Sequence, residues 1–184
     1  NLTLEEAAPL LCAGITTYSP LKHWGAEKGK KVGVVGLGGL GHMAVKYAKA
    51  MGAEVFVITT SPDKVAKAKS YGADTVIVSS DADAMAGASK SLDIIIDTAP
   101  GKHALDPYID LLGLNGTIVL VGPIATNLEF GASNVLTNRR SIAGSGIGSI
   151  AETKEMLAFS AKHNIVPDIE VIEMSKINDA WDSM

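Results

Sequence analysis

The sequence predicts an α/β protein built on a doubly wound parallel sheet, and three observations carry this prediction. Short apolar runs rich in β-branched residues alternate with helical patterns along most of the chain. These runs are nearly continuous in apolar residues, which is typical of strands covered by helices on both faces. The first run is followed at once by a glycine-rich turn, Gly36-Leu37-Gly38-Gly39-Leu40-Gly41.

The chain opens with a helical pattern that precedes the first strand. Thr3 and Glu6 have the spacing of a capping box, so a short helix is expected to begin there. Pro9 is expected to open a second helix, which runs to about His23. The apolar residues assigned to its buried face are Leu10, Leu11, Ile15 and Tyr18.

Strand and helix patterns then alternate in order along the chain. Strands are expected at residues 31–35, 54–59, 75–78, 92–97, 116–122 and 141–144. Helices are expected at residues 40–51, 61–71, 82–89, 103–112 and 149–163. Ser61 and Pro62 supply the N-cap and the first-turn proline of one of these helices. Residues 168–172 are expected to form a final extended segment.

Composition argues against several classes of partner. The net charge is −4 and no cluster of Lys and Arg stands out, so nothing indicates a nucleic acid or an anionic membrane. The lone cysteine, Cys12, cannot form an internal disulfide, which favours a reducing compartment. No apolar run approaches the roughly 20 residues of a membrane-spanning helix. We therefore expect a soluble, cytoplasmic protein.

The two ends of the sequence suggest a piece of a longer protein. Asn1 is not an initiator methionine, and Met184 follows residues that are typical of the middle of a helix. We therefore expect the chain to be a fragment.

Gly36, Gly38 and Gly41 form the pattern G-x-G-x-x-G in the context that a dinucleotide-binding turn requires. A strand precedes it, a helix follows it, and a second strand comes at the βαβ distance. Gly36 permits the tight turn, Gly38 lets the backbone approach a pyrophosphate, and Gly41 lets the helix lie close to the sheet. The helix N-terminus offers N–H groups and its positive dipole end to the phosphates. We expect the cofactor to contact all six residues of the turn, Gly36, Leu37, Gly38, Gly39, Leu40 and Gly41. A glycine-rich turn without a ligand is the alternative.

The end of the second strand favours NADP(H) over NAD(H). An NAD-selective site places an acidic residue about 20 residues after the glycines to hold the ribose 2′-hydroxyl. This chain has Thr59, Thr60 and Ser61 there, and Lys64 one turn later. Hydroxyl donors and an ammonium group suit a 2′-phosphate. Asp63 is expected in the first helical turn, where it favours the helix dipole. The alternatives are a solvated Lys64 and a plain N-cap at Ser61.

Beyond this motif the chain resembles the medium-chain zinc-dependent alcohol dehydrogenases, and within them the cinnamyl alcohol dehydrogenase branch. The segments that carry the resemblance are LLCAGITTYSPL at residues 10–21, GLGGLGH at 36–42 and GSGIG at 144–148. The resemblance covers essentially the whole chain. It implies an NADP-binding Rossmann-fold domain at residues 25–166, a helical lead-in from the catalytic domain at 1–24, and the start of the return to that domain at 167–184. The catalytic GroES-like domain itself is absent from this chain.

The resemblance also implies roles for individual residues. Cys12 corresponds to a ligand of the catalytic zinc whose other ligands lie outside this chain; the alternative is a buried small hydrophobe. Thr16 corresponds to a catalytic residue that lies beside the nicotinamide ring and helps to direct the face of hydride transfer. Thr98 is expected along the cofactor, with a plain strand-end hydroxyl as the alternative. The loops expected to fix the carboxamide are Val121-Gly122-Pro123 and Ser145-Gly146-Ile147. The histidines that receive no catalytic role are His23, His42, His103 and His163.

From the resemblance, the intact protein is expected to interconvert aldehydes, of aromatic or cinnamyl type, and primary alcohols. NADPH would carry the hydride and zinc would act as Lewis acid, whereas this chain alone would be inactive. A homodimer is implied through an edge strand near Ile142 and Ala143, with burial of this apolar segment within the monomer as the alternative. Two alternatives stay open, a zinc-free NADPH-dependent quinone or enal reductase and a non-catalytic NADP-binding sensor module. Cys12 discriminates, because neither alternative needs a metal-binding thiolate.

Overall fold

The computed structural model describes residues 2–122 and 127–182. In these residues a six-stranded sheet forms the centre of the molecule, with strand order β3-β2-β1-β4-β5-β6 and every neighbouring pair parallel. The strands are β1 (Lys31–Val35), β2 (Glu54–Thr59), β3 (Thr75–Val78), β4 (Leu92–Asp97), β5 (Leu112–Leu120) and β6 (Ser141–Gly144). The predicted doubly wound sheet is confirmed, and the strand order reverses between β1 and β4.

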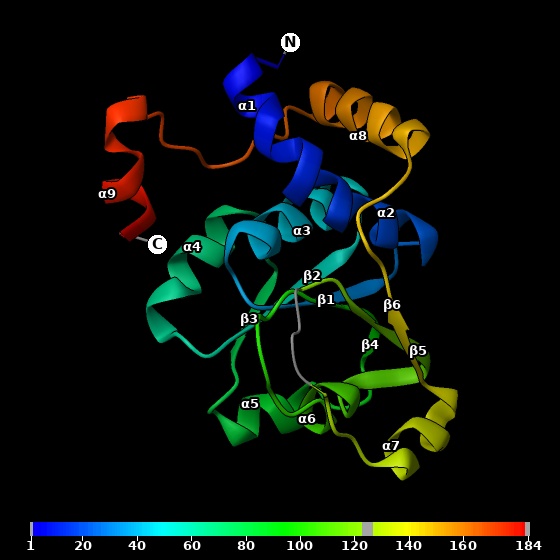
Figure 1. Cartoon of the computed structure of the whole chain (residues 1–184). Coiled ribbons are helices and arrows are strands. Elements are labelled where there is room, and N and C mark those ends of the chain that lie inside the picture. The colour runs from blue at the N-terminus through cyan, green and yellow to red at the C-terminus, as the bar shows by residue number, and fades with distance from the viewer. Residues whose placement is uncertain (1, 123–126, 183–184) are drawn as a thin grey trace.

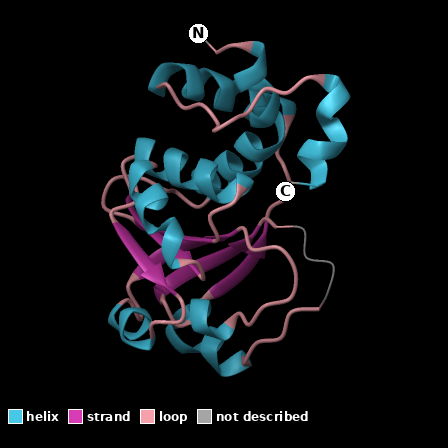
Figure 2. Ribbon diagram, turned by 90° about the vertical axis from the view of Figure 1, so that its left-hand side faces the viewer, coloured by secondary structure: helices cyan, strands magenta, loops and turns pink. Residues whose placement is uncertain are grey.

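Helices cover both faces of the sheet (Figures 1 and 2). On one face lie α1 (Leu4–Pro9), α2 (Ile15–His23), α3 (Gly39–Ala50), α4 (Val65–Ser70) and α8 (Ile150–His163). On the other face lie α5 (Ala82–Gly87), α6 (Asp106–Ile109) and α7 (Ala132–Leu136). The C-terminal α9 (Ile177–Asp182) lies away from the sheet. None of the helices in the described part of the chain is long and apolar enough to cross a membrane.

Each face of the sheet has its own buried apolar cluster. Successive side chains of a strand point to opposite faces. In β4, Ile94 and Ile96 belong to the cluster beneath α2 and α3, whereas Ile95 belongs to the cluster beneath α5 and α6. The central strands are therefore apolar at nearly every position, which is the pattern seen in the sequence.

The lead-in helix α2 packs into the same core as the sheet. Leu10, Ile15 and Leu21 are fully buried in the cluster that contains the side chains of β1 and β2. The ring of Tyr18 lies 5.5 Å from the rings of both Tyr47 on α3 and Phe159 on α8. Aromatic packing thus fixes α2 against α3 and α8, two helices on the same face of the sheet.

The prediction that Pro9 opens a separate helix is wrong. Pro9 ends α1 inside a continuous helical segment, and the next turn, Leu10–Gly14, is a π-helix that leads directly into α2. Proline lacks an N–H group for the helical ladder, and a π-turn is one way in which a helix accommodates such an interruption. The π-turn also changes the angular spacing of side chains. Leu11, which was expected to be buried, is 55% exposed.

Two other expectations fail on the C-terminal side. The helix expected at residues 103–112 is limited to Asp106–Ile109, and β5 begins at Leu112 rather than at residue 116. Leu112 pairs with Leu92 of β4, so the buried apolar run there is a strand end rather than a helix face. Residues 168–172 form no strand and run irregularly toward a short 3-10 helix, Met174–Lys176.

Glu152 anchors α8 to its own N-terminus and to α2. Its carboxylate accepts hydrogen bonds from the Ser149 N–H at 2.8 Å, the Ser149 hydroxyl at 2.8 Å and the Ser19 hydroxyl at 2.7 Å. These bonds, the Ser149 N–H first and then the Ser19 hydroxyl, lower the pKa of Glu152 from 4.5 to about 2.

The stabilisation that Glu152 contributes is therefore expected to depend on pH. A depressed folded-state pKa adds stability above the unfolded pKa of 4.5, and this stability is lost as the pH falls toward about 2. Glu152→Gln keeps a capping side chain but not the charge. Urea unfolding of both proteins between neutral pH and about pH 2 measures the effect. We expect the variant to be less stable at neutral pH and the two to converge in acid; a constant gap would contradict this assignment.

Candidate cofactor-binding site

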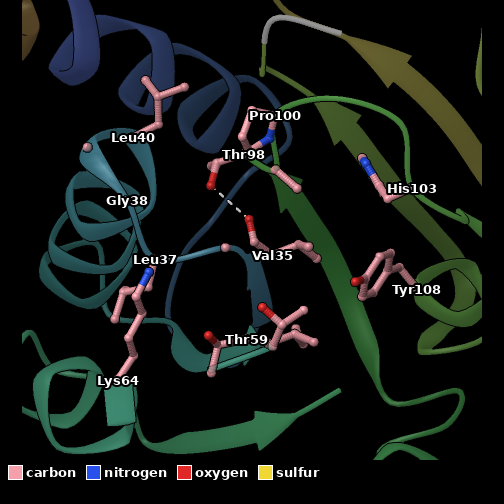
Figure 3. A pocket seen from close by; sticks show the side chains of 15 residues that line it. Val35, Leu37, Gly38, Leu40, Thr59, Lys64, Thr98, Pro100, His103 and Tyr108 are labelled. Carbon is pink, nitrogen blue, oxygen red and sulfur yellow. Dashed lines mark hydrogen bonds between the residues drawn. The ribbon is translucent and has the colours of Figure 1, made fainter. Parts of the chain in front are cut away.

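A pocket of about 660 Å³ opens at the carboxyl ends of β1, β2 and β4 (Figure 3). This is the point at which the strand order reverses, where ligands of open α/β sheets bind. The residues that line it are Val35, Gly36, Leu37, Gly38, Gly39, Leu40, Ile58, Thr59, Thr60, Lys64, Thr98, Ala99, Pro100, His103 and Tyr108. Five of the six residues of the predicted glycine turn are thus brought together with the predicted residues at the ends of β2 and β4.

The sixth residue, Gly41, lies behind the pocket and brings α3 against the sheet. A Cβ atom at this position would lie 2.2 Å from the Gly36 carbonyl oxygen, so no side chain fits. Gly36 has φ +86°, a conformation that favours glycine. The Thr98 hydroxyl donates to the Val35 carbonyl at 2.7 Å, which ties the end of β4 to the glycine turn. Thr98 therefore lines the pocket, but its hydroxyl proton is used within the protein.

The mouth of the turn is shaped to accept an anion. A Cβ atom at Gly38 or Gly39 would meet nothing within 4 Å, and both residues line the pocket. Gly38 is the N-cap of α3, so no side chain caps the first N–H groups of this twelve-residue helix. Those groups and the positive end of the helix dipole face the open space. The cradle fits a pyrophosphate.

The end of β2 lies on the other side of the pocket. Thr59 is buried, and its hydroxyl oxygen accepts the Ser61 N–H at 3.1 Å. Thr60 and Lys64 line the pocket, whereas Ser61 is not among the lining residues. Asp63 is exposed and also lies outside the lining. A phosphate at this end of the pocket would therefore meet a hydroxyl and an ammonium group.

The pocket also contains a polar pair that the sequence reasoning missed. Asp97, the last residue of β4, is fully buried, and its carboxylate accepts the Ala99 N–H at 3.1 Å. His103 Nε2 lies 2.8 Å from the same carboxylate. Burial raises the pKa of Asp97, against the opposing effects of these two hydrogen bonds. The position of Asp97 at a strand end beside the reversal point was the signal that could have found it.

Other predicted site residues lie apart from this pocket. Cys12 is exposed in the π-turn, and Thr16 is buried in the first turn of α2. Ser145, Gly146 and Ile147 follow β6 and line a separate hollow with residues of α2.

The loop after β5 touches the pocket wall without lining the pocket. A Cβ atom at Gly122 would lie 2.9 Å from the carbonyl oxygen of Ala99, which is a lining residue, and Val121 precedes it. Pro123 lies outside the described residues.

The described residues do not assemble a zinc site. No group of three or more His, Cys, Asp and Glu side chains that could hold a metal occurs among residues 2–122 and 127–182. A catalytic zinc needs three protein ligands, so Cys12 alone does not hold one. His42 packs rather than ligates: it is buried on α3, and its Nε2 accepts the Asp168 N–H at 3.3 Å.

The sheet order and the glycine-lined pocket define a nucleotide-binding domain of the Rossmann type. The chain belongs to the zinc-binding dehydrogenase family, whose model matches residues 39–162, and within it to the cinnamyl alcohol dehydrogenase branch. It is 54% identical to the aldehyde reductase YahK of Escherichia coli over 98% of the chain and 52% of the relative.

Solved structures agree with this assignment. A cinnamyl alcohol dehydrogenase from Sorghum bicolor matches 98% of the chain with a TM-score of 0.95 and 48% identity, over 52% of its own chain. A protein named CAD from Helicobacter pylori, solved as a complex with NADP(H), matches the whole chain with a TM-score of 0.88 and 44% identity, over 52% of its own chain. The present chain thus spans about half the length of these relatives.

Two glycines of the turn are expected to respond differently to alanine. Gly41→Ala forces a Cβ against the Gly36 carbonyl at 2.2 Å, so we expect it to destabilise the fold by about 2 kcal/mol or more. Gly38→Ala meets open space and is expected to leave the free energy of unfolding within about 0.5 kcal/mol of the parent. Urea unfolding of the three proteins measures both effects. Equal destabilisation by the two substitutions would contradict the close approach at Gly41.

Proposed function

We propose that this chain is the NADP(H)-binding part of a zinc-dependent alcohol dehydrogenase that interconverts aldehydes and primary alcohols. The observation that carries the proposal is the end of β2, where Thr60 and Lys64 line the pocket and Asp63 does not. A carboxylate at that position would hold the ribose 2′-hydroxyl of NAD and repel a 2′-phosphate. Bound NADPH supplies the hydride for the reaction.

The residues of the pocket divide the binding of the dinucleotide between them. The N–H groups at the start of α3 bind the pyrophosphate where Gly38 leaves room for it. Thr60 and Lys64 bind the 2′-phosphate, with Thr59 and Ser61 shaping the backbone of that turn. Ala99 and Pro100 line the pocket after β4 and close it beside Thr98.

The catalytic end of the site is proposed from the family resemblance. Cys12 would supply one thiolate ligand of zinc, Thr16 would lie beside the nicotinamide, and the backbones of Val121-Gly122 and Ser145-Gly146-Ile147 would hold the carboxamide. Cys12 is exposed, which leaves its thiol accessible to further ligands outside the described residues. Hydride transfer would take place where this part of the protein meets its catalytic domain.

The remaining features of the proposal concern the whole protein. Residues 25–166 form the cofactor domain, residues 1–24 lead in from the catalytic domain, and residues 167–184 begin the return to it. Cytoplasmic location and a homodimer formed along β6, the edge strand with Ile142 and Ala143, complete the proposal. Aromatic or cinnamyl aldehydes are the proposed substrates. The dehydrogenase family match favours this function over a sensor module or a zinc-free reductase.

Side-by-side fluorescence titrations with NADPH and NADH test the cofactor assignment. We expect tighter binding of NADPH, because the Lys64 ammonium binds a group that NADH lacks. Lys64→Glu is expected to weaken NADPH binding by about tenfold to a hundredfold, the effect of losing a hydrogen bond to a charged group, with a much smaller effect on NADH. Lys69→Glu, in α4 just after the turn that contains Lys64, is the matched control, because Lys69 is exposed and outside the pocket lining.

Equal binding of NADPH and NADH, or equal effects of the two lysine substitutions, would refute the 2′-phosphate assignment. If neither dinucleotide binds, the proposal that this chain binds a cofactor by itself, although it spans only about half the length of its relatives, is refuted.

A further inference from the structure

The Asp97–His103 pair forms part of the pocket wall, yet none of the roles assigned above uses it. Asp97 is 0% exposed and His103 is 17% exposed, so the pair is largely removed from water. His103 lines the pocket, and the loop between the two residues supplies three more lining residues, Thr98, Ala99 and Pro100. Figure 3 shows the His103 ring on the side of the pocket opposite the glycine turn and Lys64.

Both ring nitrogens of His103 face hydrogen-bond acceptors. Nδ1 lies 3.0 Å from the Gly101 carbonyl oxygen, which can only accept, so a hydrogen bond between these atoms requires a proton on Nδ1. Nε2 lies 2.8 Å from Asp97 Oδ2, and one proton must lie between these two atoms as well. The pair therefore holds one proton more than a neutral imidazole beside an ionised carboxylate.

We propose that Asp97 and His103 share this proton. The shared proton holds residues 98–103 together as one wall of the pocket, and the pair thereby positions this wall for the dinucleotide. The proposal rests on the proposed function for the identity of the ligand. His103 is a positioning residue here, since it acts through the loop. Gly101, with φ +79°, allows the tight turn that brings its carbonyl to the ring.

The surroundings favour retention of the proton. Burial raises the pKa of Asp97, and it also raises the pKa of Tyr108, whose ring lies 6.0 Å from that of His103. The charged residues near the pair are Lys102, Asp106, Glu129 and Lys64. Lys102 and Glu129 pair with each other at 3.7 Å in the hollow that His103 also lines, and Asp106 is in the same hollow. Lys64 lines the shared pocket from the end of β2. The carboxylate of Asp106 accepts the Gly131 N–H, so it is already engaged.

Loss of the shared proton would open the wall. One ring nitrogen would then present a lone pair to an oxygen, and that hydrogen bond would become a repulsion. The affinity of the pocket is therefore expected to weaken as the pH rises through the value at which the pair loses its proton.

The substitution Asp97→Asn removes the shared proton but can keep the hydrogen bonds of the pair. Its amide oxygen can accept the Ala99 N–H while its NH₂ group donates to a neutral His103 Nε2, and Nδ1 still donates to Gly101. This variant should keep the wall closed without a shared proton. His103→Gln removes the pair, and His163→Gln, at an exposed histidine outside the pocket lining, is the matched control.

The first measurement is the dissociation constant for NADP⁺ as a function of pH, from about pH 6 to 9. We expect the parent and His163→Gln to lose about tenfold in affinity across this range relative to Asp97→Asn, whose profile should be flatter. Titration of the ligand's own 2′-phosphate near pH 6 appears equally in all proteins and cancels in this comparison. His103→Gln is expected to bind weakly at every pH. Identical profiles for the parent and Asp97→Asn would overturn the proposal.

The second measurement needs no ligand, and so separates this proposal from the proposed function. Nitrogen-15 NMR of the histidine rings in the ligand-free chain reports which ring nitrogens of His103 carry protons. We expect Nδ1 of His103 to carry a proton at pH 7, because it lies 3.0 Å from the Gly101 carbonyl oxygen. A bare Nδ1 at pH 7 would overturn the shared proton even if NADP⁺ binds well. A protonated Nδ1 in a chain that binds no dinucleotide would support the pair and refute the ligand.

Discussion

The architecture of the pocket depends on the missing side chain at Gly41. A Cβ atom there would lie 2.2 Å from the Gly36 carbonyl, so any other residue would push α3 away from β1. The same hypothetical Cβ would lie 3.2 Å from the Thr98 hydroxyl, which binds the Val35 carbonyl. Helix, turn and the end of β4 therefore meet at one point. This contact directs the N-terminus of α3 at the space between β1 and β4, where the pocket lies.

The rest of the molecule holds α3 in that position from the opposite side. Tyr47 on α3 is fully buried, and its hydroxyl shares a hydrogen bond of 2.7 Å with Ser160 on α8. Tyr18 of α2 packs on the same ring, and its own hydroxyl donates to Glu155 at 2.8 Å. Helix α2, which carries Thr16 and directly follows the π-turn with Cys12, is thus fixed to the helix that begins at the glycine turn. Any displacement of α3 would move both ends of the proposed site together.

The strands were predictable from the sequence to a degree that the helices were not. Five of the six strands have the bounds expected. In the central strands, buried β-branched runs such as Ile94-Ile95-Ile96 are typical of a strand covered by helices on both faces. The start of β5 was missed because Leu111 and Leu112 are buried in either a helix or a strand, and only the pairing with Leu92 decides.

The pocket likewise has parts that the sequence predicts and a part that it does not. The glycine turn and the end of β2 are local motifs, so they were predictable. The Asp97–His103 contact depends on how the loop after β4 turns back, and residue spacing does not encode that turn.

The charge balance of the pocket explains why a buried carboxylate is compatible with a ligand that carries several phosphates. An ionised Asp97 without a partner, in the low dielectric of the wall, would repel an anion at the nearby helix N-terminus. With one shared proton, the Asp97–His103 pair would carry no net charge, while α3 and Lys64 contribute positive charge on the other side of the pocket. The pocket therefore attracts phosphate at one side and is neutral at the other. Under the proposed function, that asymmetry would give an elongated ligand a single orientation, with its phosphates at the glycine turn and its uncharged part against the wall formed by residues 98–103.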